Sequence, residues 1–68
     1  MNSIEALDFA IRKVRYSRSD VDSRITPDRP SRDRREAALA QHDAALEALR
    51  ALRQVLVDNV ASMMDERV

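Results

Sequence analysis

Apolar residues recur at steps of three and four along two segments of this 68-residue chain. The first series runs through Ile4, Leu7, Ile11, Val14, Arg18, Val21 and Ile25, and the second through Leu39, His42, Leu46, Leu49, Arg53, Leu56, Val60 and Met63. Such steps place side chains on one stripe of an α-helix, whereas a strand would need steps of two. Glycine is absent, which also favours helix. The sequence therefore predicts an all-α fold, an antiparallel hairpin of two amphipathic helices.

The segment Thr26-Pro27-Asp28-Arg29-Pro30 separates the two series. Both prolines lack an amide donor and restrict the residue before them. We expect one helical-hairpin domain, with a first helix over about residues 3–24, a turn over about 25–31 and a second helix over about 31–66. Asn2 or Ser3 would cap the first helix. The second helix would begin either with Ser31 as its N-cap or about one turn earlier, with Thr26 as cap and Pro27 in the first helical position.

The second predicted helix is the longer one, about 50 Å against about 33 Å for the first. If the chain folds back near residue 28, paired positions have numbers that sum to about 57, which places Ile11 near Leu46 and Ile4 near Arg53. Large apolar residues near the C-terminus would then have no partner within the chain. We expect a second copy to cover them in a homodimeric four-helix bundle. The expected dimer interface consists of Leu49, Leu52, Leu56, Val57, Val60, Met63 and Met64.

The net charge is zero, but residues 11–36 hold nine bases and five acids. Folding the hairpin brings this basic block to the turn end. The acids can offset the arginines in a solvated mesh of salt bridges, with Arg32 and Glu36 at the favourable spacing of four. Alternatively, the arginines dock on an acidic partner with Tyr16 as an anchor, since Tyr and Arg are enriched among binding hot spots. The candidate partner-binding residues are Arg12, Arg15, Tyr16, Arg18, Arg32 and Arg35.

Arg18, His42 and Arg53 occupy stripe positions where apolar groups are expected. The arginines either lay their methylenes on the core with the guanidinium in water, or one of them fixes the register or the oligomer order through a charge pair across the interface. His42 is expected to be structural. With one histidine, no cysteine and no Gly-rich loop, the sequence predicts no enzyme, no catalytic or metal site and no cofactor. No apolar run reaches about 18 residues, so we expect no membrane-spanning helix and a cytoplasmic location.

The turn Pro27-Asp28-Arg29-Pro30, followed by one long helix, resembles the layout of type III secretion needle subunits, which also turn at P-x-x-P. That resemblance implies a structural or filament subunit. In size and predicted architecture the chain is similar to the plasmid copy-number regulators, helical-hairpin dimers that bind RNA loops. It also shares its build with phage-encoded anti-activators and secretion co-chaperones.

Taken together, these features predict a non-enzymatic helical protein that binds itself and a larger cytoplasmic protein. The larger protein would be a regulator or a machinery component, which the chain modulates or inhibits by occlusion, as phage or mobile-element anti-activators do. The alternatives are an RNA- or DNA-binding helical dimer and a secretion-apparatus co-chaperone or needle-like subunit. The basic turn end would contact the nucleic acid in the first alternative.

Overall fold

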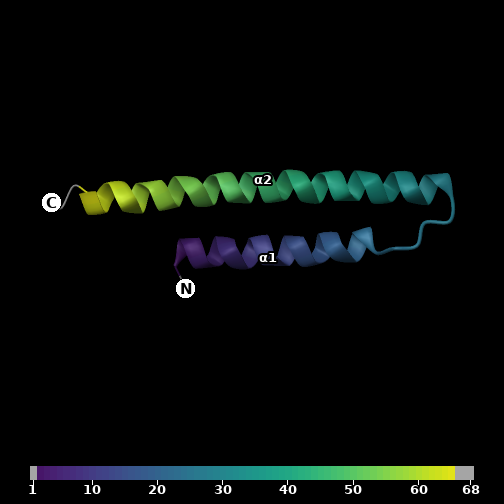
Figure 1. The fold of residues 1–68 in the computed structure, drawn as a ribbon, viewed down its shortest axis with the longest axis horizontal. Coiled ribbons are helices and arrows are strands. Elements are labelled where there is room, and N and C mark those ends of the chain that lie inside the picture. Colours follow the sequence, from purple (N-terminus) through teal and green to yellow (C-terminus); the bar gives the residue numbers. More distant parts are fainter. Residues whose placement is uncertain (1, 66–68) are drawn as a thin grey trace.

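The structure, a computed structural model, describes the backbone of residues 2–65 and the side chains of residues 2–61. Two helices, α1 (Ser3–Asp22) and α2 (Arg29–Asp65), pack side by side as an antiparallel hairpin (Figure 1). The principal-axis extents of the molecule are 61 × 18 × 10 Å. The all-helical hairpin expected from the spacing is confirmed. No helix in the described part of the chain is long and apolar enough to cross a membrane.

The ends of α1 are set by side chains that bond to the backbone. Asn2 is the N-cap, because its Oδ1 accepts a hydrogen bond of 2.8 Å from the Glu5 backbone N–H. At the other end, Ser23 Oγ donates to the Asp20 carbonyl at 2.9 Å, a local bond that competes with helix continuation. The helix therefore ends at Asp22. Ile25, which was expected to extend the apolar stripe, lies outside the helix and is 92% exposed, so that expectation is wrong.

The second helix begins at Arg29, between the two predicted starts. Neither Ser31 nor Thr26 is its cap. Asp28 takes that position, since its Oδ1 accepts from the Ser31 N–H at 3.3 Å and its carbonyl accepts from Arg32 N–H at 3.1 Å. Pro30 thus falls in the first turn, where an amide N–H has no intrahelical partner to lose. From there α2 runs without a break for 37 residues.

The register between the helices differs from the expected one by about one turn. Arg18 pairs with Asp43, and Asp8 with Arg53, so the numbers of paired residues sum to 61 rather than about 57. The connection between Asp22 and Arg29 is an open, non-helical segment that runs outward beyond the end of α1 before α2 begins (Figure 1). Because this segment is longer than a tight turn, the first turns of α2 lie past the last turn of α1.

This shift shortens the part of α2 that extends beyond α1. Leu56 and Val57 are both partly buried, and Leu56 lines one hollow together with Ile4. The expectation that Leu56 lacks a partner within the chain is therefore wrong. Val60 lies at the edge of the same hollow and remains exposed. The side chains of Met63 and Met64 lie outside the described residues.

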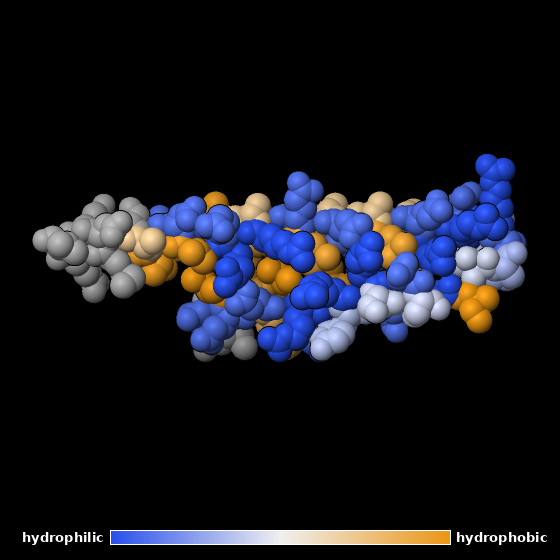
Figure 2. Space-filling view, viewed as in Figure 1, coloured by the Kyte–Doolittle hydropathy of each residue, from blue (hydrophilic) through white to orange (hydrophobic). Residues whose placement is uncertain are grey.

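The seam between the helices makes a thin core. Among the side chains of residues 2–61, only Val21 and Leu46 are buried, at 4% and 6% exposure. Apolar atoms gather along this seam and continue on α2 near the beginning of α1 (Figure 2). Several large apolar residues are about half exposed or more, with exposures from 48% to 92%, namely Phe9, Tyr16, Ile25, Leu52, Val55 and Val60. One hairpin thus covers only part of its own apolar surface.

Candidate partner-binding surface

The loop end of the hairpin carries arginines that have no carboxylate partner. Between the side chains of residues 2–61 only two ion pairs form, Arg18–Asp43 and Arg53–Asp8. The expected pair between Arg32 and Glu36 is absent there, and no mesh of salt bridges surrounds the loop. We call the unpaired group the loop-end arginines, which are Arg24, Arg29, Arg32, Arg34 and Arg35.

Three of these arginines line an open hollow of about 310 Å³ where the connecting segment meets the first turns of α2. Arg34 Nε donates to the Pro30 carbonyl at 3.3 Å, and Arg35 Nη1 donates to the Arg24 carbonyl at 3.5 Å. Arg35 Nε is buried and has no hydrogen-bond partner. Backbone carbonyls therefore orient the guanidinium groups while their charge stays uncompensated. Ile25, Thr26 and Ser31 complete this loop hollow.

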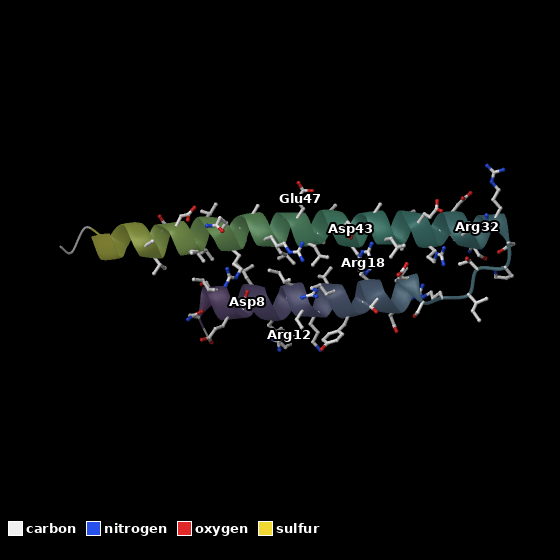
Figure 3. All side chains as sticks on the ribbon, viewed as in Figure 1. Asp8, Arg12, Arg18, Arg32, Asp43 and Glu47 are labelled. Atoms are coloured by element: carbon white, nitrogen blue, oxygen red, sulfur yellow. The ribbon has the colours of Figure 1, made fainter. Side chains whose placement is uncertain are left out.

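A second hollow, of about 290 Å³, lies on α1 and is lined by Arg12, Arg15, Tyr16 and Ser19. These residues recur at steps of three and four, so they share one face of the helix. Figure 3 shows Arg12 on the side of α1 away from α2. Tyr16 is 68% exposed. This α1 hollow presents two guanidinium groups beside an aromatic ring.

The six candidate partner-binding residues do not form one cluster. Arg12, Arg15 and Tyr16 lie together in the α1 hollow, and Arg35 lies in the loop hollow. Arg32 is exposed and lines neither of these hollows.

Arg18 faces α2, with Asp43 opposite it (Figure 3). Its Nε donates to Asp43 Oδ1 at 2.6 Å and its Nη2 to Oδ2 at 3.4 Å. The hydrogen bond and the negative charge of Asp43 raise the pKa of Arg18 above its usual value, against a small opposing effect of burial. A raised pKa in an arginine keeps the cation charged at every pH below the usual arginine range, so Arg18 does not lose its charge near neutrality. Arg18 is thus engaged within the chain.

Arg53 makes the matching contact at the other end of the seam, where its Nε donates to Asp8 Oδ1 at 2.6 Å. Both side chains of this pair are about two-fifths exposed, so its stabilising energy is limited by water. Both Arg18 and Arg53 form a charge pair within the chain, while their side chains remain more than a third exposed. The two ion pairs agree on one register between the helices, although they lie far apart along α1. Both pairs would be lost if the helices slipped by one turn.

His42 uses both ring nitrogens inside the hairpin. Its Nδ1 lies 2.6 Å from the Ala38 carbonyl and its Nε2 lies 2.8 Å from Ser17 Oγ. Because a carbonyl can only accept, Nδ1 donates, and Nε2 of the neutral ring accepts from the Ser17 hydroxyl. His42 is a hydrogen-bonded structural residue, as its position in the stripe suggested.

The sequence did not single out three residues that line the loop hollow, Arg24, Ile25 and Arg34. Ile25 was assigned to the core stripe because it follows Val21 by four positions. A signal against that assignment was present: the serines and aspartates of residues 17–23 weaken helix, and Pro27 restricts Thr26 to extended backbone. The predicted turn of about 25–31 follows from these signals and includes Ile25, so it conflicted with the assignment of Ile25 to the apolar stripe.

Among the residues with described side chains, no three His, Cys, Asp or Glu residues approach closely enough to hold a metal ion. No protein-family model matches the chain, and comparisons with curated proteins and with solved structures find no match either.

Proposed function

We propose that this chain is a non-enzymatic binding module. It forms a homodimeric helical bundle whose arginines bind an acidic surface of a larger protein. The larger protein is a regulator or a component of a machinery, and the module modulates or inhibits it by occluding the bound surface. The observation that carries this proposal is the α1 hollow, where Arg12 and Arg15, neither of which forms an ion pair within residues 2–61, lie beside the exposed Tyr16.

The chemistry of the two hollows fits carboxylates. A guanidinium that lacks an internal partner can form short, charge-assisted hydrogen bonds to an incoming carboxylate, frequently with two parallel N–H···O contacts. Ile25 and Tyr16 supply apolar contact area at the same places. Burying either side chain in a partner pocket contributes about 1.5–3 kcal/mol. Arginine beside tyrosine or an aliphatic anchor is typical of protein–protein hot spots.

A protein surface fits this end better than a nucleic acid does. Five acids, Asp20, Asp22, Asp28, Asp33 and Glu36, are interleaved with the bases of residues 11–36, and all five are exposed. A phosphate backbone would approach these carboxylates as well as the arginines, whereas a protein partner can present charges of both signs.

The dimer is part of the proposal because the hairpin leaves apolar surface uncovered. With two buried side chains in residues 2–61, the chain has little core of its own. Chains of this size usually gain stability from a disulfide, a metal or another copy, and this chain contains no cysteine. Self-association is the mechanism that its sequence leaves open.

The test is a pull-down from the native host with the immobilised chain, read by mass spectrometry. A variant with Arg12→Ala, Arg15→Ala and Tyr16→Ala should lose at least one protein that the unchanged chain captures, with unaltered helicity by circular dichroism. A control with Lys13→Ala and Arg50→Ala removes the same number of positive charges outside both hollows and should keep that protein. Capture that is equal for both variants, or that disappears on nuclease treatment, would contradict the proposal.

A further inference from the structure

The hairpin exposes much more surface than a compact monomer of its mass. The solvent-accessible area is 5570 Å² for a 7.8 kDa chain. Compact monomers of this mass expose about 4,400 Å², so the excess is about 1,200 Å². If each of two copies buried that excess, the interface would total about 2,400 Å², which lies within the range of about 2,000–5,000 Å² of permanent homodimers.

An apolar face of α2 that α1 covers only in part is centred about a quarter turn around the helix from Leu46. Leu46 is buried against α1, and with about 100° per residue Leu52 lies about 120° further around the helix. Leu52 is 50% exposed accordingly. Residues at steps of four and three define this face, which we call the side seam of α2. Its members are Ala38, His42, Ala45, Leu49, Leu52 and Leu56.

The neighbouring side of α1 carries several small residues, together with Lys13, which precedes Ser17 by four positions. The hydrogen bond between Ser17 and His42 shows which side of α1 adjoins the side seam. Ala10 and Ser3 precede Ser17 by seven and fourteen positions, so they lie on that same side. Small side chains let another helix pair approach closely. One face of the hairpin is therefore built from leucines of α2 and small residues of α1.

We propose that a second copy of this chain covers this face, with the two α2 helices antiparallel to each other and the two-fold axis beside Leu49. The loop ends then lie at opposite ends of a four-helix bundle. This inference rests on the homodimer in the proposed function. It adds which face forms the interface and how the two hairpins are oriented relative to each other, which we call the order of the bundle. The competing order places both loop ends together, with α2 of each copy beside α1 of the other.

Charge favours the loop ends being apart. The basic block of residues 11–36 has nine bases and five acids, whereas residues 1–10 have two acids and no base, and residues 37–68 have three bases and five acids. In the proposed order each basic end lies near the acidic end of the partner. In the competing order two sets of unpaired loop-end arginines lie next to each other, and like charges repel.

Helix length and side-chain size favour the same order. The 37 residues of α2 can pair along their whole length only with another α2, because α1 has 20 residues. An axis between Ala48 and Leu49 places Ala45 opposite Leu52 of the partner subunit, since the numbers of paired residues then sum to 97. A small residue of the side seam thus meets a large one. In the competing order the part of α2 that extends beyond α1 lies past the end of the partner's α1.

Spin-label distances test the order. The chain has no cysteine, so Ile25→Cys provides one labelling site on an exposed loop residue. An axis beside Leu49 places the two loop ends about 30 Å from it along α2, so the expected label-to-label distance is about 60 Å. A distance below about 25 Å would establish the competing order, and the absence of any dipolar coupling together with a monomer mass would exclude the dimer.

Two alanine variants test the face. Ala45 lies in the side seam, and Ala40 lies on the opposite, charged side of α2 between Glu36 and Glu47, while both alanines are exposed. By sedimentation equilibrium, Ala45→Lys should raise the dimer dissociation constant at least tenfold, and Ala40→Lys should leave it within about twofold. Equal dissociation constants would exclude this face. If Ala45→Lys also prevents folding, the spin-label distance still decides the order. Neither measurement involves the larger partner, so the dimer can fail while the partner-binding proposal stands, or the reverse.

Discussion

Replacing Leu46 with alanine removes one of the two buried side chains found in residues 2–61. Complete burial of a leucine contributes about 1.5–3 kcal/mol, and truncation to alanine in protein cores costs about 2–5 kcal/mol because a cavity is left. Leu46 packs against a single helix, so its surroundings can partly collapse. We therefore expect a loss of about 2–3 kcal/mol. The whole chain has about 3–10 kcal/mol of stability at typical values per residue, so this one change removes a large part of it.

Urea unfolding followed by circular dichroism at 222 nm measures this loss at one fixed chain concentration. With a slope of about 1 kcal/mol per molar urea, the midpoint should fall by about 2–3 M. Val55→Ala is the matched control, because Val55 lies on the side of α2 opposite Leu46 and is 58% exposed. Its small loss of burial is offset by the higher helix propensity of alanine, so the midpoint should move by less than about 0.5 M. A shift for Leu46→Ala no larger than that of Val55→Ala would refute the assigned register and core.

Three further predictions concern the contacts that define the hairpin. A double-mutant cycle of Asp8→Asn and Arg53→Met should give a coupling energy of about 0.2–1 kcal/mol that weakens in 1 M salt, whereas zero coupling at low salt would show that the pair does not form. Asn2→Ala should destabilise the chain by about 1 kcal/mol in urea unfolding while Ser3→Ala changes little, and the reverse order would move the N-cap to Ser3. Asp28→Ala should cost about 1 kcal/mol and speed hydrogen exchange in the first turn of α2, an effect that would be absent if another residue caps this helix.

The existence of the two helices followed from the sequence because their apolar spacing repeats over many turns. The register between the two helices did not follow from the sequence. It depends on where α1 ends and where α2 begins, and each of these positions was uncertain by about one turn. Ser23, which ends α1 locally, and Asp28, which caps α2, decide that turn. Several residues nearby could have served as caps, and the choice among them is made by packing.

The sequence indicated which residue types form the candidate surface, but not how all of these residues are arranged in space. The excess of arginine at the turn end is visible in the sequence, and Arg12, Arg15 and Tyr16 lie together because helical spacing brings them to one face. The pairing of Arg18 with Asp43 depends on the register, so spacing alone could not reveal it. Ile25 was misplaced for a similar reason, since its position depends on where α1 ends.

A hairpin that buries only two side chains within residues 2–61 places few demands on that part of its amino-acid sequence. Most substitutions that keep helix propensity and the two capping residues should leave the architecture intact, since they fall on positions in contact with water. Mutation can therefore alter the outer faces of both helices with little penalty to folding. Such a scaffold can acquire a new binding specificity one exposed residue at a time.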